Sequence, residues 1–177
     1  MKNVLLSLCL VLLSAPLVAG EPPAVGEDAP AFKLQDQYGD WNALEDYEGQ
    51  WLAVYFYPKD DTPGCTKEAC NFRDNIYAFK AIGAAVVGVS VDDVESHKTF
   101  SDKYKLPFTL LADEDRAMAG AYGVLKDYKV LSVASRQSFL VSPDGKIAKH
   151  YAKVKPDTHT QEVLADIEAF MAKAESS

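Results

Sequence analysis

The residues of this chain best suited to redox chemistry are two cysteines in one short segment, Cys65 and Cys70. The apolar run 52–57 predicts a buried strand, and a loop rich in proline, aspartate and glycine follows it. Thr62 as N-cap and Pro63 at the first helical position then predict the start of a helix. Cys65 therefore falls in the first turn, where free amide groups and the helix dipole favour an anion. We expect its thiol to ionise more readily than a free thiol, which favours a reactive cysteine over a small core residue.

The elements around this segment are predicted to alternate between strands and helices. Asp92 and Thr158 are each followed three residues on by Glu or Gln, which predicts a capping box at the start of two of the helices. The alternation indicates one α/β domain over residues 21–177, a sheet with helices on both faces and an N-terminal β-hairpin. The expected strands are 32–36, 41–44, 52–57, 85–90, 108–111, 137–141 and 147–151, and the expected helices are about 63–80, 92–104, 113–122 and 158 onward.

Residues 1–20 have a different character from the rest of the chain. Lys2 precedes an apolar run over residues 4–13, and the small-residue run 18–20 follows it. This pattern predicts a secretory signal peptide, because the apolar run is too short for a comfortable membrane span. An uncleaved anchor is the alternative. We therefore expect an exported protein, periplasmic or else secreted or lumenal, with no membrane attachment after cleavage.

The net charge and the cysteine count restrict the partners. A formal net charge of -8 argues against binding nucleic acid or anionic lipid through the general field of the protein. Removal of residues 1–20 takes Cys9 away and leaves only Cys65 and Cys70. In an exported protein, two cysteines usually form a disulfide, which is either structural or part of a catalytic cycle.

The segment around Cys65 resembles the active site of the peroxiredoxins. Pro58, Thr62 and Cys65 match the family pattern P-x-x-x-T-x-x-C, and Cys70 at C-x4-C spacing is similar to the bacterioferritin-comigratory/PrxQ subfamily. Arg136, which leads into a predicted strand, is similar to the family's second motif. The resemblance covers roughly residues 24–175. It implies a thioredoxin-like fold, with a central mixed sheet flanked by helices, and thiol peroxidase activity.

The resemblance also implies a role for each matching residue. Cys65 would be the peroxidatic cysteine, whose thiolate attacks a hydroperoxide and becomes a sulfenic acid. Pro58 would shield the sulfur from solvent, and Arg136 would hold the thiolate and polarise the peroxide. Thr62 has two interpretations, since its hydroxyl either caps the helix at the Cys65 amide or contacts the peroxide. Physical chemistry agrees with these roles, but the residue types alone leave Thr62 undecided.

Cys70 would be the resolving cysteine, which attacks the Cys65 sulfenate to form a Cys65–Cys70 disulfide. In an unbroken helix, residues five apart are rotated by about 140° and their Cα atoms lie about 8–9 Å apart. A disulfide needs about 4.4–6.8 Å, so the two sulfurs cannot bond while the helix is intact. We therefore predict that oxidation unwinds part of the segment 63–72, and that the pair cycles instead of serving as a static crosslink.

The implied activity needs no cofactor and no metal. The three histidines are scattered and have no partner at metal-ligand spacing. The expected partners are a hydroperoxide substrate and a thioredoxin-like reductant on the same side of the membrane. A monomer is expected because both cysteines lie in one segment. The alternatives are a thiol-disulfide oxidoreductase, which usually carries C-x-x-C, a copper-delivery protein of the Sco type, which needs C-x3-C, and a non-enzymatic exported module with a structural disulfide.

Overall fold

The computed structural model describes residues 20–128 and 131–176 of the 177-residue chain. Within them a mixed sheet has the strand order β2-β1-β5-β4-β3-β8-β9, and β6 and β7 form a separate two-stranded sheet. β4 pairs in parallel with both β3 and β5, whereas β8 is antiparallel to β3 and to β9. The α/β class, the mixed sheet and the N-terminal hairpin of β1 and β2 are confirmed.

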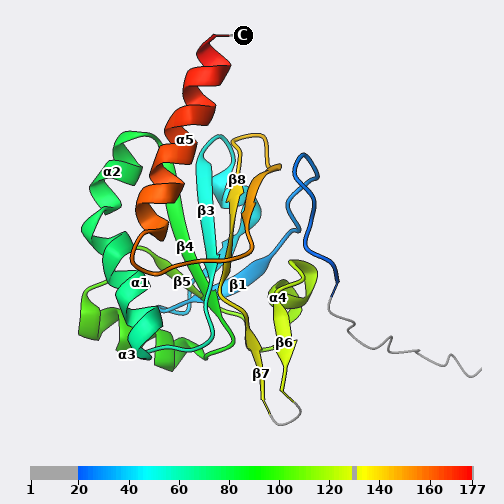
Figure 1. Cartoon of the computed structure of the whole chain (residues 1–177). Coiled ribbons are helices and arrows are strands. Elements are labelled where there is room, and N and C mark those ends of the chain that lie inside the picture. The colour runs from blue at the N-terminus through cyan, green and yellow to red at the C-terminus, as the bar shows by residue number, and fades with distance from the viewer. Residues whose placement is uncertain (1–19, 129–130, 177) are drawn as a thin grey trace, which may run out of the picture.

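Strands and helices alternate through the middle of the chain, and strands follow one another directly on either side of it (Figure 1). The strands are β1 (Lys33–Asp36), β2 (Trp41–Ala43), β3 (Trp51–Phe56), β4 (Ala84–Ser90), β5 (Thr109–Ala112), β6 (Leu125–Asp127), β7 (Ser132–Ala134), β8 (Gln137–Val141) and β9 (Ile147–Tyr151). The helices are α1 (Pro63–Asp74), α2 (Ile76–Ala81), α3 (Val94–Tyr104), α4 (Ala117–Ala121) and α5 (His159–Glu175), and a 3₁₀ helix, η1, spans Leu44–Tyr47.

Side chains alternate across the buried strand β3 and feed two cores, one on each face of the sheet. Tyr55 points into a core with Cys65 and Phe72, on the side that α1, α2 and α5 cover in Figure 1. Phe56 points into the other core, which contains Phe139 and is covered by α4 and the N-terminal segment. Burial on both faces explains why 52–57 reads as a continuous apolar run.

Three local expectations are wrong in detail. The helix expected over 63–80 is interrupted at Asn75, whose side chain donates to the Asn71 carbonyl and competes with the helical backbone pattern. The helix expected to begin at Asp92 is capped by Asp93, which accepts a hydrogen bond from the Ser96 amide.

The capping box expected at Thr158 is also absent, because that threonine makes no side-chain capping bond. Gln161 instead donates to the Asn75 side chain, which ties α5 to the junction of α1 and α2. The segment 124–135, in which no strand or helix was expected, carries β6 and β7, paired antiparallel. No helix within 20–128 and 131–176 is long and apolar enough to cross a membrane. A signal peptide is predicted over 1–20, and residues 1–19 of that segment lie outside the described residues.

Candidate active site

Cys65 lies in the first turn of α1, as the sequence predicts, and its side chain is buried. Pro63 occupies the first helical position, and Thr62 stands before it in an extended conformation. The thiol is free, so the site is described in its reduced state. The sulfur therefore sits at the positive end of a twelve-residue helix that directly follows the central strand and its loop.

Arg136 reaches the sulfur from a distant part of the chain. Its Nη2 lies 3.0 Å from the Cys65 Sγ and donates to it. The antiparallel register of β3 and β8 pairs Phe56 with Gln137, so the residue before β8 arrives beside the loop that leaves β3. A Cβ on Gly64 would lie 3.2 Å from Arg136 Nη2, so the glycine leaves room for the guanidinium. The positive charge of Arg136 therefore directly faces the Cys65 sulfur.

Glu68 is a third member of the group. Its carboxylate pairs with Nη1 of Arg136, so one guanidinium bridges the carboxylate and the sulfur. Glu68 is fully buried, and its Oε1 has no hydrogen-bond partner within the described residues. Burial raises the pKa of Glu68 to about 7, and the attraction of Arg136 opposes this rise. The carboxyl group therefore changes charge near neutral pH, directly beside the cation that faces the thiol.

Neither Glu68 nor Arg73 belongs to the motifs by which the sequence indicates the candidate site. The structure separates the two residues. Arg73 donates to the Tyr104 carbonyl and to Asp74, away from the sulfur. Glu68 stands three residues after Cys65 and lies on the same buried face, a spacing that could have identified it as a carboxylate in need of a cation.

Thr62 occupies the N-cap position of α1, but its side chain makes no capping hydrogen bond. Its Oγ1 donates to the Lys59 carbonyl at 3.0 Å, and no side-chain capping bond is formed. The predicted N-cap position of Thr62 is thus confirmed, whereas the interpretation in which its hydroxyl bonds the Cys65 amide is wrong. Pro58 lies partly buried at the start of the same loop. The shielding role of Pro58 and a contact of Thr62 with peroxide stay predictions.

Cys70 lies in the same unbroken helix as Cys65 and is also free. Cys65 is buried, while Cys70 is partly exposed. The separation of about 8–9 Å expected for residues five apart in a helix exceeds the reach of a disulfide. The intact helix on which the predicted Cys65–Cys70 separation rests is therefore present. It follows that α1 must open before these two sulfurs can bond.

The described residues hold no group of three or more His, Cys, Asp or Glu side chains arranged to bind a metal. The histidines lie in packed surroundings: His97 and His159 are fully buried, and His150 stacks on Phe139 with ring centroids 4.4 Å apart. Burial and the positive charge of Arg136 lower the pKa of His159 to about 4. His159 is therefore neutral at physiological pH.

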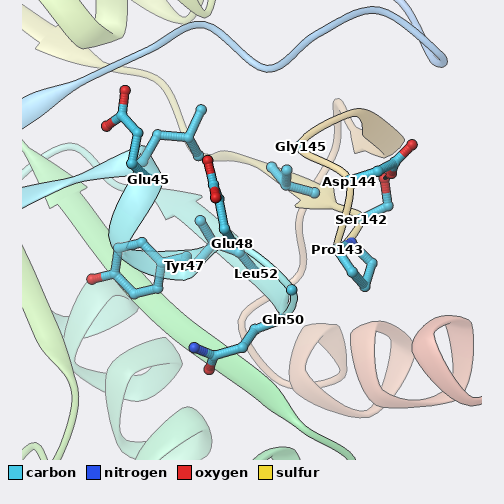
Figure 2. Close-up of a pocket in the computed structure, with 12 residues that line it drawn as sticks. Glu45, Tyr47, Glu48, Gln50, Leu52, Ser142, Pro143, Asp144 and Gly145 are labelled. Atoms are coloured by element: carbon cyan, nitrogen blue, oxygen red, sulfur yellow. Dashed lines mark hydrogen bonds between the residues drawn. The ribbon is translucent and has the colours of Figure 1, made fainter.

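A pocket of about 400 Å³ lies at the other end of the sheet. Figure 2 shows η1 and the turn 142–145 forming its walls, with Glu45, Glu48 and Asp144 around it. The pocket sits where β3 begins, whereas Cys65 follows the end of β3. None of the residues that line it belongs to the group around the sulfur. The group around the Cys65 sulfur is therefore separate from this pocket.

A buried thiol at a helix start, held by a guanidinium beside a mixed sheet, defines a cysteine-dependent redox enzyme. The chain belongs to the AhpC/TSA family, whose sequence pattern matches residues 25–150. It is 44% identical over 144 residues to a putative peroxiredoxin Bcp of Coxiella burnetii, and the match covers 79% of this chain and 95% of that protein.

Two solved structures extend the comparison to three dimensions. A mutant PrxQ of Xylella fastidiosa superposes with a TM-score of 0.81 at 33% identity, covering 86% of this chain and 99% of that one. The bacterioferritin comigratory protein of Xanthomonas campestris, described for its alkyl peroxide reduction, gives a TM-score of 0.75 at 37% identity and covers 78% and 91%. The resemblance to Bcp/PrxQ peroxiredoxins, the thioredoxin-like fold and a thiol peroxidase activity on hydroperoxides are therefore confirmed.

Proposed function

We propose that Cys65 is the peroxidatic cysteine and that Cys70 resolves its oxidised form. The thiolate of Cys65 attacks one oxygen of the hydroperoxide, the O–O bond breaks, and the leaving oxygen takes a proton to depart as water or alcohol. Arg136 stabilises the thiolate and the charge that develops on the breaking bond. The observation that carries this proposal is the 3.0 Å contact between Arg136 Nη2 and Cys65 Sγ at the start of α1.

The second step is closure of a Cys65–Cys70 disulfide. The Cys70 thiol attacks the Cys65 sulfenic acid, a sulfur–sulfur bond forms and water leaves. The intact α1 supports a requirement for unwinding within 63–72, since neither sulfur can reach the other in a helix. A dithiol donor then reduces the disulfide by exchange and is itself oxidised. We assign this role to a thioredoxin-like protein.

A mass measurement tests both steps. The reduced protein and the variants Cys65→Ser and Cys70→Ser are each treated with one equivalent of hydrogen peroxide. We expect the wild type to lose about two hydrogens, Cys65→Ser to remain unchanged, and Cys70→Ser to gain oxygen. Oxidation of Cys65→Ser at Cys70 at the wild-type rate would contradict the assignment of roles.

Pro58 and Thr62 complete the proposed site. Pro58 begins the loop after β3, and Thr62 immediately precedes α1. Because its hydroxyl does not cap the helix, the Thr62 side chain is available to turn toward a peroxide oxygen. Pro58 would limit the access of water to the sulfur and so slow further oxidation of the sulfenic acid.

We further propose that the protein acts outside the cytoplasm as a monomer. The basic start, apolar run and small residues of 1–20 support export, and amino-terminal sequencing of the protein from a periplasmic fraction would test cleavage. The intramolecular position of Cys70 supports the monomer, because closure of the disulfide needs no second chain. Light scattering of the reduced and oxidised forms should give the mass of one chain in both.

A further inference from the structure

The most completely bonded histidine of the described chain lies behind the active-site loop. His97, in α3, is fully buried, and both of its ring nitrogens have partners. Nδ1 lies 2.8 Å from Oδ2 of Asp60, and Nε2 lies 3.0 Å from the carbonyl oxygen of Leu111 in β5. The ring thus joins the loop between β3 and α1 to the third strand of the parallel part of the sheet.

These partners determine where the ring carries hydrogen. A carbonyl oxygen only accepts, so Nε2 must donate to Leu111. The carboxylate of Asp60 also accepts from the hydroxyls of Tyr57 and Ser96, each at 2.8 Å. Burial and the neighbouring Asp60 raise the pKa of Tyr57 well above its ordinary range, so that phenol remains a donor. A lone pair on Nδ1 facing this carboxylate at 2.8 Å would be repelled, so the geometry favours a hydrogen on Nδ1 as well.

The loop that Asp60 belongs to is held at further points by α3 and by the residues that precede this helix. The Asp60 amide donates to Asp92 Oδ2 at 2.9 Å. Asp61 accepts from Lys103 and from the Tyr104 hydroxyl, each at 2.6 Å. Asp61 has a φ of 55°, a left-handed conformation that is uncommon for a residue other than glycine. Such a conformation persists when its surroundings over-determine it, and the contacts with α3 do so here.

We propose that His97 is a positioning residue of the peroxidase, a doubly protonated ring whose ion pair with Asp60 fixes the loop 58–62 against β5. The inference rests on the proposed role of Cys65, because this loop carries Pro58 and leads through Thr62 into the first turn of α1. The ring nitrogens of His97 bond Asp60 and Leu111 and not the Cys65 sulfur, so His97 acts through the loop. The charged groups around the ring are Asp60, which it contacts, and Asp92, which binds the Asp60 amide.

Replacement of the ring should slow the reaction of Cys65 with hydroperoxide more than it perturbs folding. His97→Gln keeps a polar side chain of similar size but cannot donate a hydrogen bond both to Asp60 and to the Leu111 carbonyl as the ring does. A reacting atom misplaced by about 1 Å can cost about 100-fold in rate, so we expect the second-order rate constant for Cys65 oxidation to fall at least about ten-fold. Stopped-flow measurements on the reduced variants, well below their melting temperatures, give this rate.

The matched control lies on the same helix. Ser101 is buried and donates to the Leu106 carbonyl at 3.2 Å, a bond that does not involve the active-site loop. Ser101→Ala therefore removes one buried hydrogen bond of α3 and leaves in place the bonds of Lys103 and Tyr104 to Asp61. Its oxidation rate should equal that of the wild type even if its melting temperature falls. Equal rates for His97→Gln and wild type, with only a lower melting temperature, would show a structural role and overturn the proposal.

A spectroscopic measurement tests the protonation directly and does not need His97→Gln to fold. Proton–nitrogen correlation spectra of the wild type near neutral pH should show hydrogens on both ring nitrogens of His97. In Asp60→Asn the side-chain amide can donate to Nδ1, so only the Nε2 hydrogen should remain. A wild-type ring with one hydrogen would refute the ion pair. If the assignment of Cys65 as the peroxidatic residue fails, Cys65→Ser would still consume peroxide whatever the protonation of His97. That outcome is therefore distinguishable from a failure of the His97 proposal.

Discussion

The buried carboxyl group of Glu68 should make the stability of the reduced protein depend on pH in a specific direction. Its pKa rises from an ordinary value of 4.5 to about 7 because burial disfavours the ionised form. A carboxyl whose pKa is raised on folding binds a proton in the native state where the unfolded state has lost it. Its stabilising contribution is complete below about pH 4.5 and is lost as the pH rises through about 7.

The magnitude follows from the same shift. Each pKa unit corresponds to about 1.4 kcal/mol, so the contribution lost across this window is about 3 kcal/mol. The buried His159 acts in the opposite direction: its pKa is lowered from 6.5 to about 4, and it stabilises the native state progressively as the pH rises between these values. The two windows overlap, so the pH profile of the wild type alone does not isolate Glu68.

Comparison with Glu68→Gln isolates it. Urea unfolding of both reduced proteins between about pH 4.5 and 8 gives the difference in unfolding free energy, in which groups common to both cancel. We expect the wild type to lose about 3 kcal/mol relative to the variant over this range. Glu95→Gln, at an exposed position of α3, is the matched control for the same chemical change. A difference that stays constant with pH, or grows in favour of the wild type, would refute the reasoning.

Substitutions at three further positions test neighbouring groups. Arg136→Met should lower the rate of Cys65 oxidation by about 100- to 1,000-fold, and Arg136→Lys by less, because a lysine keeps the charge without the planar fork; stopped-flow rates that match the wild type would contradict the contact. Thr62→Val should slow peroxide reduction while Thr62→Ser retains it, and full turnover in the valine variant would remove the hydroxyl from the mechanism. His159→Gln should abolish the loss of stability on acidification below about pH 6.5, which urea unfolding relative to wild type would reveal.

The local part of the site could be predicted because the signals that form it are adjacent in the chain. A strand, a breaking loop, and Thr62 with Pro63 suffice to place Cys65 in the first turn of a helix. The spacing of Cys70 then follows from helix geometry alone. Arg136 is different, since only the register of β8 against β3 brings it to the sulfur. Its arrival was expected from the family motif and not from any local property of residue 136.

The helix boundaries that the sequence did not reveal depend on side chains that compete for the same backbone groups. Asn75 interrupts a helix whose apolar spacing continues past it, because its amide donates back to Asn71. Asp92 and Asp93 are both good caps, and the loop decides between them: the Asp60 amide binds Asp92, which leaves Asp93 to cap α3. The role of Asp60 and His97 was equally hidden, because their pairing requires the packed arrangement of loop, helix and strand.

The contacts on either side of the cysteines define how far α1 can open. Before Cys65, the loop is tied to α3 through Asp60. After Cys70, the Asn71 side chain donates to the Pro156 carbonyl at 2.7 Å, and the ring of Phe72 is fully buried. The unwinding that we propose between these anchors would expose Glu68 and bring its carboxylate back into water. Since burial raises the pKa of that group to about 7, the open form gains relative to the closed helix as the pH rises above the ordinary carboxyl range. The carboxylate that faces the active-site arginine therefore also lowers the free energy needed to open the helix, and disulfide closure should become easier over the same pH window in which the folded protein loses stability.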